Sequence, residues 1–329
     1  MDRDEDTSRR AREEISALFG EVQAHTATNY VKRGAWYLAA ERLYTPGTLP
    51  RLARPEIPGF GPKVYWGLLL NHITGHRVRL PLNNTAVQIA ENGKRIRAFE
   101  PELGLTRKLV SRDSKYGRGI ATDLSVRQGT LTEAGVRHPA LRTTREVAGH
   151  VFFEEELIRG RRFRPQVDGR LTATHLVEPL SRLHATVGLR TLALTEALGN
   201  ATVDRLLALD IDTGFVRHVQ ALIDRNPRAT VAFGHGDLLP SNLAVDRTGV
   251  VFLDWETAGY ALVGFDLLRL WRKYPRVKPL ARGAATLIRR HQTGPLSFYD
   301  TACLQLAIGL LGARKARHRH VLRHLPKAA

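Results

Sequence analysis

The residues best suited to chemistry stand in one short stretch, HGDLLPSN, at positions 235–242. Asp237 follows a short β-like run, and the glycine and proline beside it favour a tight loop from which its carboxylate can accept a proton from a substrate hydroxyl. Asn242 supplies a carbonyl oxygen, and Asp254 supplies a second carboxylate twelve residues later, after the apolar run VVFL. Such oxygen ligands suit Mg²⁺, which takes one or two protein carboxylates together with substrate phosphates and water. A base and two metal ligands are the set that phosphoryl transfer needs.

Each of these residues also has a structural interpretation. Asp237 alone fits a turn-capping aspartate, and Asn242 alone fits a helix or turn cap. Their joint occurrence with Asp254, in this order and at this spacing, favours the chemical interpretation.

These motifs resemble the aminoglycoside phosphotransferase/choline kinase-like family, small-molecule relatives of the protein kinases. HGDLLPSN resembles the family's catalytic loop and FLDWE its metal-binding segment, and three flanking matches occur in the family's order: FFEEELIRG at 152–160, LSRLHA at 180–185 and GFDLL at 264–268. The resemblance covers about residues 105–270. It implies a protein-kinase-like fold in which Asp237 is the base, Asn242 and Asp254 hold Mg²⁺, and the γ-phosphate of ATP passes to an acceptor hydroxyl. It further implies that His235 is a buried structural residue, and we expect His184 to be a packed helix residue rather than a ligand.

The resemblance also implies two nucleotide contacts. A lysine on the third strand contacts the α- and β-phosphates, and Lys108 stands at that position, with Arg107 and Arg112 as its nearest competitors. Glu156, four residues before Gly160, matches the hinge where adenine meets backbone groups.

Two departures from the family pattern leave an alternative open. The family lysine pairs with a helix glutamate, yet residues 113–129 contain none; Asp123 is the mid-helix acid there, and Glu133 lies near the helix end. The turn at 91–94 has one glycine, so few backbone N–H groups can approach a phosphate. The alternative is a catalytically silent kinase-like module that binds a partner or an anionic surface.

The remaining pattern predicts the elements that must position these residues. Apolar spacing predicts helices at 8–22 and 29–44. After them, short alternating runs and the Asn-Gly turn of ENGK predict a small antiparallel sheet with one inserted helix. Its strands are expected at 85–90, 95–99, 105–110 and twice within 138–157, and its helix at 113–131. Beyond residue 174 the pattern is mainly helical, with β-like runs at 230–235 and 250–255.

The predicted fold class is therefore α+β and bilobal, with the protein-kinase-like arrangement that the resemblance implies. An N-terminal helical extension is expected at 1–80 and a nucleotide-binding small lobe at 81–160. A helical catalytic and substrate lobe with a basic C-terminal tail is expected at 161–329.

The charge balance bears on the acceptor. Fifty Lys and Arg residues against 32 Asp and Glu residues give a formal net charge of +18 at pH 7. Eight basic residues follow one another from Arg269 to Arg290 without an acid between them, in the region where this family builds its acceptor site. Such charge disfavours a cationic aminoglycoside and favours an anionic acceptor: a phosphorylated or carboxylated sugar, a glycolipid head group or a lipopolysaccharide-type saccharide.

The excess of positive charge is also compatible with roles unrelated to the acceptor. Arginine-rich composition can be a habit of the source genome, with the side chains solvated on helix faces. The basic tail at 312–329 suits peripheral contact with the inner face of an anionic membrane, at about 1 kcal/mol per basic residue. It also suits nonspecific contact with nucleic acid, although little aromatic interleaving argues against a single-strand platform, and no specific nucleic acid is expected.

Several classes of protein are excluded. The single cysteine, Cys303, excludes a disulfide framework and a Cys-rich zinc site. The charged N-terminal sequence lacks the apolar stretch of a signal peptide, and the longest apolar runs fall far short of the ~20 residues that span a bilayer. The sequence predicts a soluble, cytoplasmic enzyme.

Overall fold

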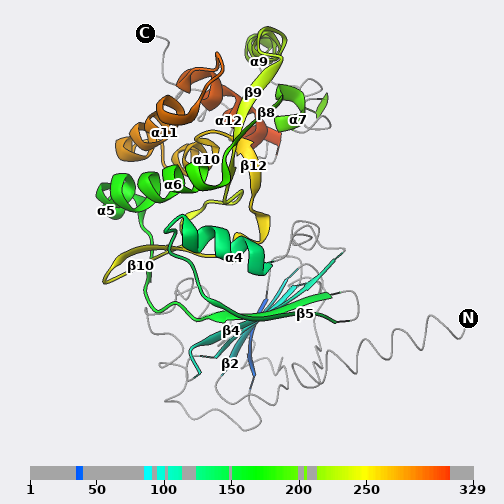
Figure 1. The fold of residues 1–329 in the computed structure, drawn as a ribbon, viewed down its shortest axis with the longest axis vertical. Helices are drawn as coiled ribbons and strands as arrows, with labels where there is room; N and C mark the ends of the chain where they lie inside the picture. The colour runs from blue at the N-terminus through cyan, green and yellow to red at the C-terminus, as the bar shows by residue number, and fades with distance from the viewer. Residues whose placement is uncertain are drawn as a thin grey trace, which may run out of the picture. The chain divides into compact units, whose positions relative to one another are not determined.

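The computed structural model describes residues 35–39, 85–90, 95–100, 103–112, 124–147, 150–198, 204–205 and 213–311 of the chain. They form two compact units (Figure 1). The first contains the described residues up to Gly129, with His138–Arg162 and Ala244–Arg247. The second contains Thr130–Arg137, Phe163–Leu243 and the described residues from Thr248 onward. One unit is rich in strands and the other is mainly helical, which confirms the predicted α+β class; the boundaries at residues 80 and 160 stay predictions.

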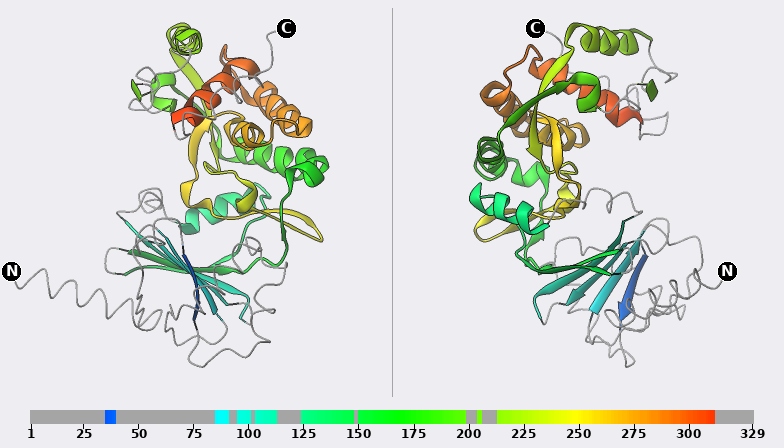
Figure 2. Two further views of the ribbon diagram at one scale, coloured as in Figure 1. Left: turned by 180° about the vertical axis from the view of Figure 1, so that it is seen from behind. Right: turned by 45° about the vertical axis from the view of Figure 1, so that its right-hand side comes forward.

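A six-stranded antiparallel sheet dominates the first unit, and Figure 2 shows its strands as one twisted layer. The strand order is β1-β2-β3-β4-β6-β5. Strand β4 lies between β3 and β6, and all but one of its seven residues are buried, as expected for a central strand. The strands are β1 (Ala35–Ala39), β2 (Thr85–Ala90), β3 (Arg95–Glu100), β4 (Leu105–Ser111), β5 (Leu141–Val147) and β6 (His150–Glu156). Strands β2 to β6 confirm the predicted strands.

Strand β1 corrects one prediction. A helix was expected over 29–44, but Ala35–Ala39 pairs antiparallel with β2. A five-residue apolar run fits either period, and its two aromatic residues favour a strand. Pairing with the backbone of β2 decides between the two. The rest of that predicted helix, the one predicted at 8–22, the turn at 91–94 and the tail at 312–329 lie outside the described residues.

Helix α4 (Leu124–Glu133) follows the third predicted strand along the chain, as expected. Its predicted first part, residues 113–123, lies outside the described residues, and so does Asp123. The side chain of Gln128 ties α4 to the start of β5: its Nε2 donates to the carbonyl of Pro139 at 2.6 Å, and its Oε1 accepts the backbone N–H of Leu141 at 2.7 Å. The unit also holds β7 (Arg161–Arg162), which pairs with β10 (Leu243–Asp246).

The second unit is built mainly from helices. A three-stranded antiparallel sheet, β12-β9-β8, packs among them, with β8 (Leu189–Ala193), β9 (Arg228–Gly234) and β12 (Gly259–Leu262). Strand β11 (Gly249–Phe252) and strand β9 confirm the two β-like runs, while β8 and β12 were not predicted. The longer helices are α6 (Glu178–Val187), α9 (Thr213–Arg225), α10 (Phe265–Lys273), α11 (Lys278–His291) and α12 (Phe298–Leu311). The shorter ones are α5 (Pro165–Asp168), η4 (Gly169–Leu171), η5 (Ala173–Val177), α7 (Leu194–Leu198), η6 (Pro240–Asn242) and η7 (Trp255–Thr257).

Helix α12 lies in the core of this unit. Its residues 301–307 are all buried, so packing surrounds it on every side rather than along one stripe. It joins a hydrophobic cluster with Leu222 of α9 and Val231 of β9. None of the helices in the described part of the chain is long and apolar enough to cross a membrane.

Two histidines pack together where α6 meets α11. The rings of His184 and His291 lie 5.1 Å apart in an edge-on arrangement, and His184 is 4% exposed. Its Nδ1 is buried and has no hydrogen-bond partner within the described residues. Burial, and secondarily the nearby His291, lower the pKa of His184 to about 3. His184 is therefore a packed helix residue, as predicted.

We expect His184→Leu to make the protein less sensitive to acid. Because the folded pKa of about 3 lies below the ordinary 6.5, the unfolded chain binds a proton in this interval that the folded chain does not, so stability falls as the pH falls from about 6.5. At about 1.4 kcal/mol per pKa unit, wild type should lose roughly 3 kcal/mol from this residue by about pH 4. Urea unfolding of both proteins between neutral and acid pH measures the difference. Parallel losses in the two proteins would contradict this assignment.

Candidate active site

The turn that carries Asp237 follows strand β9 and is built around two glycines. A Cβ at Gly234 would lie 2.5 Å from Oδ2 of Asp266. Gly236 has a φ of +77°, and a Cβ there would lie 2.1 Å from the carbonyl oxygen of Thr257. A larger residue at either position would therefore displace the turn.

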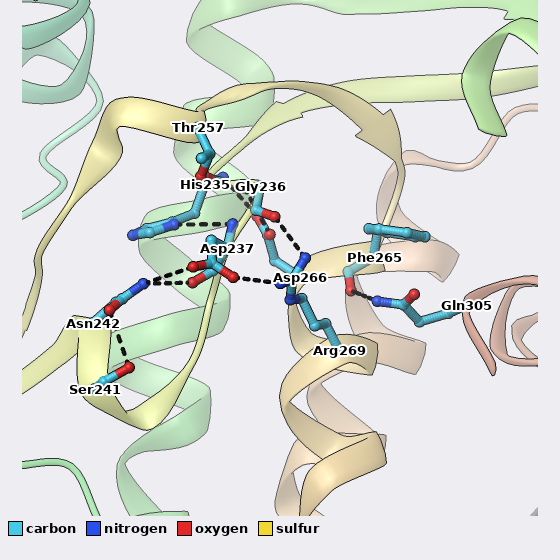
Figure 3. A network of polar contacts seen from close by, with 10 residues as sticks. All are labelled: His235, Gly236, Asp237, Ser241, Asn242, Thr257, Phe265, Asp266, Arg269 and Gln305. Atoms are coloured by element: carbon cyan, nitrogen blue, oxygen red, sulfur yellow. Dashed lines mark hydrogen bonds and ion pairs between the residues drawn. The ribbon is translucent and has the colours of Figure 1, made fainter. Parts of the chain in front are cut away.

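Asp266, in the first turn of α10, holds this turn by two hydrogen bonds (Figure 3). The backbone N–H of His235 donates to its Oδ2 at 2.7 Å, and that of Gly236 donates to its Oδ1 at 3.0 Å. Burial raises the pKa of the Asp266 carboxyl from its ordinary value, while the two N–H donors and Arg269 act in the opposite direction. The conformation of the turn depends on this one buried side chain.

His235 links the turn to the segment after β11. The side chain is fully buried; Nε2–H donates to the carbonyl of Leu253 at 2.6 Å, and Nδ1 accepts the backbone N–H of Asp237 at 3.3 Å. This pattern assigns the neutral, Nε2-protonated tautomer. The ring also packs against Trp255, with 4.7 Å between ring centroids. Both ring nitrogens are engaged with the backbone, so His235 is structural, as predicted.

Both carboxylate oxygens of Asp237 have partners in this unit. Arg269 pairs with Oδ1 through Nη2, and its Nη1 donates to the carbonyl of Gly236 at 3.0 Å. Nδ2 of Asn242 donates to the backbone carbonyl of Asp237 at 2.8 Å and to its Oδ2 at 3.3 Å. The Asp237 side chain is still 20% exposed, so its carboxylate is fixed in a position that solutes can reach. The sequence reasoning counted Arg269 among the basic residues and missed this pairing.

Asn242 and Asp254 lie close together, before β10 and after β11 respectively. The backbone N–H of Leu253 donates to the carbonyl of Asn242 at 2.8 Å, and Asp254 is the next residue. Asp254 adopts a left-handed backbone conformation with a φ of 57°, alone among the non-glycine residues that the structure describes. Such conformations cluster at functional sites. The amide nitrogen of Asn242 is turned to Asp237, and its oxygen accepts the hydroxyl of Ser241 at 3.1 Å.

This donor set suits a hard divalent cation that is shared with a bound nucleotide. An amide oxygen and a carboxylate are ligands that Mg²⁺ prefers, and its remaining ligands come from phosphates and water. Within the described residues, no group of three or more His, Cys, Asp or Glu side chains is placed to hold a metal alone. Two oxygen donors, from Asn242 and Asp254, fit a cation whose coordination is completed by phosphates and water.

Lys108, in the first unit, has a carboxylate partner on the neighbouring strand. Its side chain is 2% exposed, its Nζ lies 2.5 Å from Oε1 of Glu155, and it sits 5.3 Å from the ring centroid of Phe153. Of the two fallback partners, Asp123 lies outside the described residues, and Glu133 is exposed at the end of α4.

The sequence reasoning missed Glu155 because strand register is not visible in a sequence. In the structure Lys108 stands opposite Phe153, which makes Glu155 its diagonal neighbour on the same face of the sheet. On the other face Arg107 pairs with Glu154 at 2.7 Å. Three consecutive glutamates at the end of an apolar strand were the available signal.

Glu156 is exposed at the end of β6. Its backbone N–H donates to the carbonyl of Ala140 at 2.8 Å. Four residues later, a Cβ at Gly160 would lie 2.8 Å from the carbonyl oxygen of Val245, so the predicted Glu-to-Gly spacing ends at a position that needs glycine. The role of Glu156 at a nucleotide hinge stays a prediction.

Comparison with known proteins places part of the chain in context. Residues 130–299 match the model of a phosphotransferase enzyme family, APH, a range that contains Asp237, Asn242 and Asp254. The chain is similar to the choline kinase LicA from Streptococcus pneumoniae, with 15% identity, a TM-score of 0.48, and 71% of this chain and 89% of that chain covered.

Two further solved structures are also similar to the chain. For a choline/ethanolamine kinase family protein from Mesorhizobium loti, the identity is 17%, the TM-score 0.46, and the coverage 67% of this chain and 74% of that chain. For the aminoglycoside phosphotransferase APH(3'')-Id from Streptomyces rimosus, the identity is 14%, the TM-score 0.45, and the coverage 67% of this chain and 90% of that chain. No curated protein matches the chain in sequence.

We expect Glu155→Gln to destabilise the first unit by about 3 kcal/mol, because it leaves the buried charge of Lys108 without this carboxylate. Glu154→Gln is the matched control: its partner Arg107 is 21% exposed, and the loss of such a pair costs at most about 1 kcal/mol. Urea unfolding of the two variants measures both values. Equal losses would show that Lys108 does not depend on Glu155.

Proposed function

The chain belongs to the phosphotransferase enzyme family, and we propose that it is an ATP-dependent kinase that transfers the γ-phosphoryl group to a hydroxyl of a small-molecule or saccharide acceptor. The observation that carries this proposal is the position of Asp237. Its turn is anchored by Asp266, it is partly exposed, and it lies beside Asn242, whose backbone is joined to the segment of Asp254. A base next to two oxygen donors is the arrangement that this chemistry requires.

Asp237 is the base in this proposal. The acceptor hydroxyl donates to its carboxylate, and the proton passes to that carboxylate as the acceptor oxygen bonds to the γ-phosphorus. The bond from the γ-phosphorus to the oxygen that bridges it to the β-phosphorus breaks, and ADP leaves with that electron pair. Because little covalent chemistry falls to the protein, orientation supplies much of the acceleration. The fixed turn of Asp237 supports that role.

The nucleotide and the metal are assigned to four residues. Asn242 and Asp254 would hold Mg²⁺, which when bound neutralises charge on the β- and γ-phosphates. Lys108 would contact the α- and β-phosphates, and the ion pair with Glu155 supports this by holding its ammonium group in place. Glu156 would mark the hinge where adenine meets backbone groups.

We infer an anionic acceptor from the charges of α10 and α11. Asp266 is the one acid on these two helices. It is buried against the turn of residues 235–237, which we call the catalytic turn. Six of their basic residues are exposed or partly exposed without a role in that turn, and they create a positive potential that attracts anions. Contact of the basic tail with a membrane concerns residues outside the described part of the chain and stays a prediction.

Thermal unfolding with ATP tests the nucleotide site without knowledge of the acceptor. A ligand that binds only the folded form at 100 times its Kd adds about 2.7 kcal/mol of stability. We expect ATP to raise the Tm of wild type in a manner that requires Mg²⁺, and we expect Asp254→Ala to abolish this shift. No shift at millimolar Mg·ATP would overturn the kinase proposal.

We expect Asp237→Asn to lower turnover by about 10²–10⁴-fold, because it removes the proton acceptor, and to keep the shift in Tm with Mg·ATP. ADP release with a panel of hydroxyl acceptors measures turnover. Unfolding without ligand is the control for folding, since the substitution also removes the partner of Arg269. A variant that keeps most of its activity would refute the role of Asp237. A wild type that binds Mg·ATP but phosphorylates no acceptor would favour the silent kinase-like module.

A further inference from the structure

Helix α10 carries two guanidinium groups beside the proposed base. Arg269 and Arg272 are one helical turn apart, on the helix whose Asp266 anchors the catalytic turn. Arg269 holds Asp237 and the carbonyl of Gly236, as Figure 3 shows. Its Nε is buried and has no hydrogen-bond partner among the described residues. The guanidinium of Arg269 therefore has one donor beyond those that hold the turn.

Arg272 is a half-buried cation that no described carboxylate balances. Its hydrogen bond is with a backbone carbonyl, that of Gln305, at 3.3 Å. Gln305 is itself fixed in the core, because its Nε2 donates to the carbonyl of Phe265 at 3.2 Å. Burial, and then the charge of Arg269, lower the pKa of the Arg272 guanidinium from its ordinary value. Two positive groups one helical turn apart are thus both partly buried, and a bound anion that reached both would be favourable.

This environment separates Arg272 from the other basic residues of the two helices. Lys278, Arg282 and Arg289 are exposed, and their charges are solvated. Arg290 is paired with Glu178 at 2.8 Å. A general excess of arginine accounts for such surface residues, but it does not account for a half-buried guanidinium that has no carboxylate partner among the residues the structure describes.

Arg269 also affects how accessible the carboxylate of the proposed base, Asp237, is to an acceptor hydroxyl. Asp237 Oδ1 is occupied by Arg269, and Oδ2 is contacted by Asn242 at 3.3 Å. An acceptor hydroxyl that must donate to this carboxylate competes with the guanidinium of Arg269. A second anion close to Arg269 would compete with Asp237 for that guanidinium.

We propose that Arg269 and Arg272 together bind an anionic group of the acceptor, a phosphate or a carboxylate, and that this anion draws Arg269 away from Asp237 so that the base can receive the acceptor hydroxyl. Two guanidiniums match the several oxygens of such a group through charge-assisted hydrogen bonds. A neutral acceptor leaves Arg269 on Asp237, and a cationic acceptor is repelled by Arg272. The acceptor class is therefore a phosphorylated or carboxylated polyol or sugar. This inference rests on the proposed kinase function.

Calorimetric titration of matched probe pairs tests it. The probes are glycerol 3-phosphate against glycerol, glucuronate against glucose, and inorganic phosphate alone. Each is titrated into protein saturated with Mg²⁺ and the ATP analogue AMP-PNP, so that no probe anion can occupy the nucleotide's phosphate site. The proteins are wild type, Arg272→Gln, Arg272→Lys and the control Arg228→Gln. Arg228 is an exposed arginine at the far end of β9, about 20 Å along the strand from the catalytic turn.

We expect the anionic probe of each pair to bind wild type, and the neutral one to bind at least tenfold more weakly. Arg272→Gln should weaken the anionic probes by about tenfold or more, as the loss of hydrogen bonds to a charged group implies. The affinity of Arg272→Lys for the anionic probes should fall between those of wild type and Arg272→Gln. The affinity of Arg228→Gln should match that of wild type. The Tm of Arg272→Gln should equal or exceed that of wild type, since the substitution removes a half-buried charge that no carboxylate of the described residues balances.

Each of the following results would overturn the inference. Neutral and anionic probes could bind alike, or Arg272→Gln and Arg228→Gln could weaken the anionic probes equally, as diffuse surface attraction predicts. Arg272→Gln could weaken AMP-PNP instead of the probes, which would assign the guanidiniums to the nucleotide. It could also lower Tm while leaving the anionic probes unaffected, which would make Arg272 structural. If wild type binds no Mg·AMP-PNP, the kinase proposal itself fails, and this inference fails with it. If wild type binds Mg·AMP-PNP normally but binds no anionic probe, the inference alone is refuted.

Discussion

The rest of the candidate active site depends on the two hydrogen bonds that Asp266 accepts from the catalytic turn. The turn has glycine at 234 and 236, so it cannot hold its shape through side chains at those positions. Burial disfavours the charged form of Asp266, and the two backbone donors offset that cost. Because the anchor lies in a helix of the packed second unit, the carboxylate of Asp237 is positioned before any substrate arrives. Such preorganisation is what a reaction limited by orientation requires.

Helix α10 acts on the base in two ways. Asp266 holds the backbone of the turn, and one helical turn later Arg269 pairs with the side chain of Asp237. A displacement of this helix would therefore alter both the position of the base and its electrostatic partner. His235 extends the connection, since its ring joins the turn to Leu253 and so to the segment of Asp254. The proposed base and the proposed metal donors are thus positioned by one hydrogen-bonded framework.

The local part of this site could be predicted from the sequence, and the non-local part could not. Asp237 and Asn242 share one short loop, so their spacing alone brings them together. Arg269 reaches Asp237 across 32 residues, and Glu155 reaches Lys108 from a neighbouring strand. These pairings depend on helix packing and strand register, which burial over the whole unit decides. The prediction of a helix at 29–44 was wrong at β1 for the same reason. The short apolar run of β1 fits both the helical and the strand period, and pairing with β2 determines that a strand forms.

The environment of a charge says more about the acceptor than the amount of charge does. A net charge of +18 is compatible with solvated arginines, with a membrane surface or with nucleic acid. The environment of Arg272 does not fit these general explanations, because the side chain is half-buried and its hydrogen-bond partner is a carbonyl rather than a carboxylate. A polyanion needs basic side chains spread over an exposed face, where each phosphate displaces solvent and counterions. Two guanidiniums one helical turn apart, the first of them paired with the proposed base, favour instead our proposal of a single compact anion on the acceptor molecule.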